Sequence, residues 1–462
     1  MLFNSPVFLF AFLPICYGVY WSLRSANAKY QWLAMSGYVF YGYWNPWFCL
    51  LMAFSTLVSY TAGLGFLTWD DPRRRRLCLV VPIVVDLSLL GFFKYANFGV
   101  ASARDLLHLF GTDVRAPHWN IILPIGISFY TFHTISYIVD SYRRTIRPTR
   151  NIFEFAAYVS LFSQLIAGPI VRFRQIEEDL EAVGTQDRHR WLMRGIDFFI
   201  VGLVEKVVIA DSLAAFVDPA LAHHATLSTV GAWLAVIGYT FQLYFDFSGY
   251  STMAVGLGYL FGLRIPQNFN SPYKALDPSD FWQRWHISLS SVLRDYLYIP
   301  LGGNRDGTAR TYRNLMLTML LGGLWHGANW TFVAWGGYHG LLLCAHRVWR
   351  PAWDRVPRLA RQLAMFLFAV MGWVLFRSTD FRMALGLFGT MFQWTPGALP
   401  AGTALVLPLL AVAAWWAMVG PNVFEMRFPE TWRVRAALTG GFAIALALIM
   451  GLHTSPFLYF QF

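Results

Sequence analysis

The clearest sign of the fold is the segment Leu320 to Gly340, LLGGLWHGANWTFVAWGGYHG. It lies inside a longer run, from Asn314 to His346, that contains no Lys, Arg, Asp or Glu. This run exceeds the ~20 apolar residues that cross a bilayer, so we place it in hydrocarbon or in packed protein. Ionisable side chains are rare at such depth, and His326 is therefore a candidate functional residue.

A lone histidine in an apolar helix is more often a hydrogen-bonded interior residue than a catalytic group. A second histidine, His286, lies in DPSDFWQRWHISLSSVLRDYLYIP, Asp277 to Pro300, where aromatic and charged residues are mixed. Neither a lipid-facing span nor a solvated loop has this composition. Two such histidines favour a functional site over a structural role.

The composition predicts a polytopic membrane protein. Hydrophobic residues make up 56% of the chain and charged residues only 13%, with a mean hydropathy of +0.45. Soluble domains carry roughly a quarter charged residues. The net charge of +11 does not indicate nucleic-acid binding, because the arginines form short blocks between apolar runs, a pattern typical of cytoplasmic loops. The four cysteines show no metal-binding or redox spacing, so we expect no metal site.

The first half of the chain alternates between apolar runs and basic blocks. Tyr30 to Trp69 carries no charge and is broken at Asn45-Pro46, which predicts two helices. The block DDPRRRR, Asp70 to Arg76, assigns the next loop to the cytoplasm and the N-terminus to the outside. In the following run Asp86 is a minor site candidate, but we favour a structural hydrogen-bonding role for it. Asn97 to His118 is predicted to be amphipathic and to lie along the outer face, and Trp119 to Val139 to cross back.

Several later segments are not predicted to be simple transmembrane helices. Phe155 to Val171 is short and ends in AGPIV, which predicts a re-entrant segment, with Gln164 to Arg174 beside a water-filled funnel. Trp191 to Leu213 carries Asp197, Glu205 and Lys206, which must face the protein interior. Glycines and aromatics from Tyr239 to Tyr273 predict the lining of a cavity. With further spans between Gln362 and Leu452, we expect one domain, 1–462, with about eleven transmembrane helices and both termini outside.

Known hydrolase, nucleotide-binding and zinc motifs are absent from the sequence. A neutral imidazole in a partly hydrated tunnel acts as a general base toward a hydroxyl, worth roughly 10²- to 10⁴-fold in rate, and needs an activated acyl donor such as a thioester. Arginines on the cytoplasmic side and the turn LGGNRDG, Leu301 to Gly307, are candidates for binding the phosphates of acyl-CoA. The alternative is a plain tight loop with arginines that only set topology. These arginines are Arg284, Arg294, Arg305, Arg310 and Arg313.

Two motifs resemble the signature of the membrane-bound O-acyltransferase family. They are DFWQRWHISLS, Asp280 to Ser290, and LWHGANW, Leu324 to Trp330. The opening FNSPVFLFAFLP, the block YFDFSGYS at Tyr244 to Ser251, the LGGNR turn and the closing FLYFQF are similar to the bacterial polysaccharide branch of that family. The resemblance covers nearly the whole chain.

The resemblance implies an all-α bundle, with re-entrant and in-plane helices, around a central tunnel. It implies that His326 is the catalytic histidine and that His286 occupies the second active-site position. In the family pattern an acidic residue follows YFDFSGYS, whereas this chain has Thr252. Substrate-binding candidates from the two motifs and the basic side are Asp280, Trp282, Arg284, Trp285, Arg294, Arg313, Trp325 and Asn329.

The leading hypothesis is acetyl transfer across a bacterial inner membrane, from cytoplasmic acetyl-CoA to periplasmic partner proteins that modify an exported polysaccharide. Alginate is the polymer we expect first, and its contact with this chain is expected to be indirect. Acetyl-CoA is a substrate, and no cofactor is expected to stay bound. Related members act on peptidoglycan, cellulose or teichoic acid. Two rival functions belong to different classes: a transporter or channel for a polysaccharide or acyl donor, and a passive scaffold for a soluble transferase.

Overall fold

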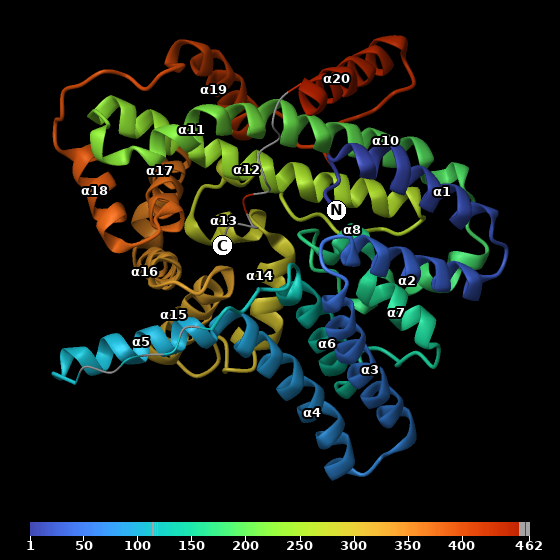
Figure 1. Ribbon diagram of the computed structural model, residues 1–462. Helices are drawn as coiled ribbons and strands as arrows, with labels where there is room; N and C mark the ends of the chain where they lie inside the picture. Colours follow the sequence, from blue (N-terminus) through green and yellow to red (C-terminus); the bar gives the residue numbers. More distant parts are fainter. Residues whose placement is uncertain (113–114, 116, 118, 452–457, 459–462) are drawn as a thin grey trace. The chain divides into compact units, whose positions relative to one another are not determined.

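The computed structural model describes residues 1–462 except 113–114, 116, 118, 452–457 and 459–462. Within the described residues every regular element is a helix (Figure 1). The chain forms two compact units, Met1–Gly195 with Leu257–Pro266, and Ile196–Gly256 with Gln267–Phe462. The all-α prediction is therefore confirmed, whereas the single domain stays a prediction.

The first unit is built from helices that precede the long helix α12. The helices α3, α4 and α6 pack together, and α2 packs on α7. Their bounds are η1 (Phe8–Phe12), α1 (Leu13–Ser22), α2 (Ala26–Gly42), α3 (Trp47–Thr68), α4 (Pro72–Leu90), η2 (Gly91–Tyr95), α5 (Ala96–Leu109), α6 (Ile127–Tyr142), α7 (Ile152–Ser160), α8 (Phe162–Leu165), α9 (Phe173–Glu181) and η3 (Ala182–Gly184).

The second unit contains both histidine segments. Two helices, α10 (His189–Leu203) and α12 (Thr229–Leu260), run from one unit into the other. The remaining bounds are η4 (Val204–Asp211), α11 (Ser212–Ala222), η5 (His224–Thr226), η6 (Pro272–Lys274), α13 (Pro278–Arg284), α14 (Ile287–Leu293), η7 (Arg294–Tyr298), α15 (Thr308–His326), α16 (Trp330–Trp353), α17 (Arg358–Arg377), α18 (Phe381–Phe392), α19 (Thr403–Met418) and α20 (Trp432–Gly451).

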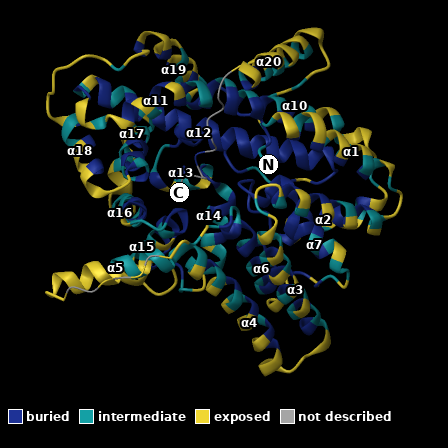
Figure 2. Cartoon of the chain, in the orientation of Figure 1, coloured by how far each residue is buried: buried dark blue, intermediate teal, exposed yellow. Residues whose placement is uncertain are grey.

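The membrane character follows from long apolar helices with outward-facing side chains. Among the described residues, four helices are long and apolar enough to cross a bilayer: Trp47–Thr68, Pro72–Leu109, Arg358–Arg377 and Trp432–Gly451. Shorter apolar helices are Phe8–Ser22, Phe381–Phe392 and Thr403–Met418. Figure 2 shows α12 largely buried and much of α4, α5 and α20 exposed. The chain is a multi-pass membrane protein.

Local sequence decides most of the helix boundaries. Helix α2 ends at Gly42 and α3 begins at Trp47, so the break lies at Asn45-Pro46 as predicted. Helix α5, which forms the first part of the segment Asn97 to His118, continues α4 through the π-helical turn η2. Its position along the outer face stays a prediction. The π-turn η2 begins at Gly91 and lets the helix continue with a local irregularity. Residues 113, 114, 116 and 118 of that prediction lie outside the described residues.

Helix α6 starts later than the predicted crossing at Trp119 to Val139. Gly126, with φ of +80°, precedes its first turn, and a Cβ there would lie 2.5 Å from the carbonyl oxygen of Leu165. Proline at position 124 also stops an earlier start. The predicted re-entrant region consists of α7 and the four-residue α8, followed by non-helical backbone. Ala167, Ile170 and Val171 of this non-helical backbone are buried, as irregular backbone in a membrane protein requires.

Several charged side chains inside the apolar helices have hydrogen-bond or ion-pair partners. Asp86 accepts hydrogen bonds from Ser55 and Thr134, both at 2.6 Å, which confirms its structural role. In the second unit Asp197 pairs with Arg435 at 2.7 Å. Lys206 lies 2.5 Å from Asp246 and 2.7 Å from Asp211. Asp197, Glu205 and Lys206 are buried, so the prediction that they face the interior is confirmed.

Candidate functional site

The segment Leu320 to Gly340 forms a tight helical hairpin. Helix α15 ends at His326, and α16 begins at Trp330 after a short turn. The two helices cross closely at Gly323 and Gly336, where a Cβ on Gly323 would lie 3.1 Å from the Cα of Gly336. Small residues at a crossing let two backbones approach, and here they fix the end of α15. His326 is therefore held at a defined position.

Aromatic rings surround His326. Its side chain is only 4% exposed. Ring centroids of Trp335, Trp325 and Phe376 lie 5.0, 5.1 and 5.3 Å from its own. Edge-to-face packing of this kind restricts the imidazole to few orientations.

His286 lies at the junction of α13 and α14 in a left-handed backbone conformation. Its φ and ψ are 44° and 54°, which a residue with a Cβ adopts only when the surroundings enforce it. The ring is fully buried, 4.7 Å from Phe247 and 6.0 Å from Trp325 between centroids. The centroids of His286 and His326 lie 6.4 Å apart. The structure thus brings together the two histidines that the sequence separates by a whole helix.

Hydrogen bonding distinguishes the two nitrogens of His286. Nδ1 lies 3.1 Å from the side-chain oxygen of Asn268. Nε2 is buried and has no hydrogen-bond partner among the described residues. His286 lies between two seven-residue helices, outside the spans, and burial lowers its pKa to about 3. The imidazole is neutral at physiological pH.

A third histidine, which the sequence did not single out, joins the same aromatic cluster. His339 is buried on α16, with its centroid 4.9 Å from that of Trp335 and 5.2 Å from that of Trp282. Both of its nitrogens lack hydrogen-bond partners within the described part of the chain. It belongs to the segment Leu320 to Gly340, and its place in the same charge-free run as His326 was the signal that could have identified it.

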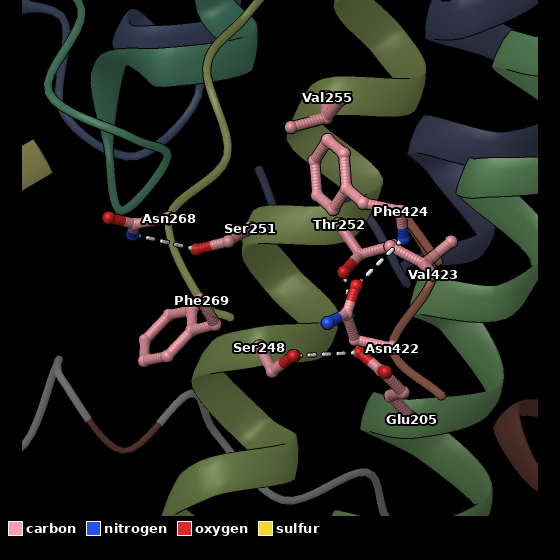
Figure 3. A pocket seen from close by; sticks show the side chains of 10 residues that line it. All are labelled: Glu205, Ser248, Ser251, Thr252, Val255, Asn268, Phe269, Asn422, Val423 and Phe424. Atoms are coloured by element: carbon pink, nitrogen blue, oxygen red, sulfur yellow. Dashed lines mark hydrogen bonds between the residues drawn. The ribbon is translucent and has the colours of Figure 1, made fainter. Parts of the chain in front are cut away.

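A small polar pocket lies beside Asn268 (Figure 3). Glu205 is buried there and accepts hydrogen bonds from Ser248 at 3.1 Å and from Thr252 at 3.4 Å. The acidic group that the family pattern suggested at position 252 is absent, but a carboxylate from η4 contacts Thr252. The other lining residues are Ser251, Val255, Asn268, Phe269, Asn422, Val423 and Phe424.

Comparison with known proteins identifies the family of this chain. The model of the membrane-bound O-acyltransferase family matches residues 87–386, a range that contains both histidines. The chain belongs to the membrane-bound O-acyltransferase family. It is 47% identical over 407 residues to the "Probable alginate O-acetylase" of Azotobacter vinelandii, covering 86% of this chain and 79% of that protein.

Two further relatives show the range of the family. The chain is 46% identical over 397 residues to the "Probable alginate O-acetylase" of Pseudomonas aeruginosa, covering 85% of this chain and 75% of the relative. It is 38% identical over 419 residues to the peptidoglycan O-acetyltransferase of Helicobacter pylori, covering 83% and 78%. This chain is thus an O-acyltransferase of the membrane.

The charged candidates of this acyltransferase contact neighbours in their own segment. Arg284 pairs with Asp280 at 2.6 Å and donates to the carbonyl oxygen of Asn270 at 3.2 Å. Arg294 pairs with Asp295 at 2.7 Å, and Arg313 donates to the side-chain oxygen of Asn314 at 3.0 Å. Binding of substrate by these side chains stays a prediction, since a bound phosphate would share them with the present partners.

The remaining candidates of the acyltransferase lie close to the histidines or support them. Trp285 is buried 4.7 Å from Trp373, and Trp282 contacts Trp335 at 5.7 Å between centroids. Asn329 caps α16 by accepting a hydrogen bond from the backbone of Thr331 at 3.0 Å. Among the described residues no group of three His, Cys, Asp or Glu side chains is suited to hold a metal ion.

Proposed function

We propose that this acyltransferase passes an acetyl group from cytoplasmic acetyl-CoA to periplasmic partner proteins that O-acetylate an exported polysaccharide, with alginate as the polymer. The observation that carries the proposal is the buried pair of His286 and His326, whose centroids lie 6.4 Å apart. Nε2 of His286 is buried among aromatic side chains and has no hydrogen-bond partner among the described residues. The names of the two relatives with 46% and 47% identity support alginate as the polymer.

The proposed chemistry needs a single base. The hydroxyl oxygen of the acceptor attacks the thioester carbonyl carbon while the ring of His326 takes the hydroxyl proton. The carbon–sulfur bond then breaks, and coenzyme A leaves as a thiol after it receives that proton. The apolar rings around His326 keep bulk water away from the thioester, which favours transfer over hydrolysis.

The membrane face at which coenzyme A binds follows from where charge is tolerated. Coenzyme A carries several phosphate charges, and moving one unpaired charge to the bilayer centre costs at least roughly 2.5 to 3.5 kcal/mol. The nucleotide therefore stays at the cytoplasmic face near Arg284, Arg294 and Arg313, and only the thioester arm reaches His326 through a central tunnel. The proposal places the single domain in the bacterial inner membrane, with about eleven spans and both termini in the periplasm.

Peptidoglycan is a second candidate for the polymer that receives the acetyl group. The relative from Helicobacter pylori carries the name peptidoglycan O-acetyltransferase, and it matches this chain over most of its length. A transporter or channel is the alternative of a different class, but it requires no pair of buried histidines.

Labelled acetyl-CoA tests the proposal directly. The purified protein, reconstituted in proteoliposomes with its neighbouring periplasmic proteins, should move labelled acetyl to one of those proteins and then to alginate rather than to peptidoglycan. His326→Ala should lower the transfer rate by at least about 10²-fold while insertion and folding stay normal. Full transfer by a well-folded His326→Ala protein would refute the catalytic assignment. Export of unmodified polymer without acetyl transfer would favour the transporter.

Topology is tested by tags. A tag at Arg74 should be accessible only from the cytoplasm, and tags at the two termini only from the periplasm. Termini on opposite faces would show that a segment assigned as re-entrant crosses the membrane, or that a predicted span does not.

A further inference from the structure

The side-chain oxygen of Asn268 meets two hydrogen-bond donors of Ser288 and one ring nitrogen of His286. Its Oδ1 lies 3.2 Å from the backbone nitrogen and 2.8 Å from the hydroxyl of Ser288, and 3.1 Å from Nδ1 of His286. A backbone N–H group only donates, so the atom that faces Ser288 must be the oxygen of the amide and not its nitrogen. The orientation of this amide, usually ambiguous, is thereby determined.

The same oxygen determines the protonation of His286. An amide oxygen only accepts, so Nδ1 bonds to it only when Nδ1 carries the hydrogen. The hydroxyl of Ser288 lies 3.4 Å from Nδ1, but it gives its own hydrogen to the same amide oxygen at the shorter distance of 2.8 Å. In a neutral ring the other nitrogen, Nε2, is then an unprotonated acceptor. Nε2 is buried and has no partner in the described part of the chain.

Asn268 is fixed by hydrogen bonds of both its side-chain nitrogen and its main chain. Its Nδ2 donates to the hydroxyl of Ser251 on α12 at 3.1 Å (Figure 3). Its main-chain carbonyl accepts the backbone hydrogen of Ile287 at 2.9 Å. Asn268 thus receives the first two backbone N–H groups of α14, which His286 at the N-cap position leaves without a side-chain cap. Asn268 is 1% exposed, so water does not compete for these bonds.

We propose that Asn268 is a positioning residue that holds His286 as the Nδ1–H tautomer, so that Nε2 receives an O–H or N–H donor of the bound substrate. His286 then does not donate from Nε2 to the developing oxyanion of the thioester. The role in turnover rests on the proposed acyl transfer, whereas the tautomer does not. The contacts of Asn268 also maintain the left-handed backbone that aims the ring.

The tautomer is measurable without substrate. In protein labelled with [15N]histidine, the resonances that disappear in His286→Gln belong to His286. We expect a protonated, pyrrole-type Nδ1 and an unprotonated, pyridine-type Nε2. Asn268→Leu should give a mixture of tautomers or the reverse pattern. A protonated Nε2 in the wild-type protein would overturn the inference and leave acetyl transfer untouched.

Kinetics separate positioning from packing. Asn268→Leu should lower kcat at least tenfold in the wild-type background and have almost no further effect in the His286→Ala background. An equal loss in both backgrounds would show that Asn268 acts independently of His286. Absence of any acetyl transfer in the wild-type protein, together with the expected tautomer, would refute only the proposed function.

Asn268→Asp covers the case in which Asn268→Leu does not fold. It keeps an acceptor for Ser288 and His286 and adds a negative charge beside the imidazole, which favours the protonated ring. In a plot of kcat against pH, the acidic limb, where kcat falls as the pH decreases, should therefore move to higher pH. The ring of His326, which contacts that of His286, is present in both proteins. Asn314→Asp, at another fully buried asparagine, is the matched control and should not shift the limb. An unshifted limb in Asn268→Asp would contradict the inference.

Discussion

The ring planes of His286 and His326 are inclined by 60° with 6.4 Å between their centroids. The two side chains reach this distance from different supports, one from a strained junction and the other from the end of a tightly packed hairpin. Trp325 lies against both rings. The two imidazoles thus share Trp325 as a packing neighbour.

Removal of both histidines should cost little more than removal of one. His326→Ala and His286→Ala should each lower kcat/KM strongly, and the double variant should lie within about tenfold of the worse single variant, because residues that act as a unit are not additive. The measurement is a double-mutant cycle, in which kcat/KM is determined for the wild type, the two single variants and the double variant. Losses that multiply in the double variant would mean that the histidines serve separate steps.

Stability should depend on pH through His286. Burial lowers the pKa of His286 in the folded protein from 6.5 to about 3, so the unfolded chain binds the proton more readily between these values. The free energy of unfolding should thus fall as pH decreases below about 6.5, by about 2 kcal/mol at pH 5. The Tm in detergent should drop less between pH 8 and pH 5 for His286→Gln than for the wild type. Equal drops would show that His286 titrates normally.

Asn329 should act through helix α16 rather than through substrate. Asn329→Ala removes the cap on Thr331 and should cost about 1 kcal/mol of stability with an unchanged KM. Asn329→Asp keeps the accepting oxygen and loses only the bond from Nδ2 to the carbonyl of Thr379. Its Tm should stay closer to that of the wild type. A raised KM at a native Tm would restore Asn329 to the substrate-binding residues.

Arg284 should influence binding of acyl-CoA. Arg284→Gln removes a half-buried charge and should weaken acyl-CoA binding severalfold in a titration, whereas Arg284→Lys should retain most of the affinity. Arg350→Gln is the matched control, since Arg350 also pairs with an acidic residue one helical turn away, Asp354. Equal affinities for Arg284→Gln and Arg350→Gln would place the nucleotide elsewhere.

The sequence predicted the membrane class and the break at Asn45-Pro46, because these depend on local hydropathy. It also singled out His286 and His326 through the rarity of charge in apolar runs, and their catalytic role stays a prediction. It did not predict Asn268 as the partner of His286, nor Glu205 beside Thr252. These contacts join segments that no local periodicity relates. The left-handed backbone at His286 was also not predicted, since a histidine adopts it only under tertiary constraint. The continuous helix through η2 was missed because a π-turn carries no strong local signal.

The ion pairs of Lys206 have a consequence for the biogenesis of this protein. Asp211 lies in the same helical segment, but Asp246 lies on α12, which leaves the ribosome later. A lysine with incomplete pairing is unfavourable in lipid. Lys206 therefore completes its pairing only after α12 has been synthesised, and we expect η4 to reach its final environment together with α12.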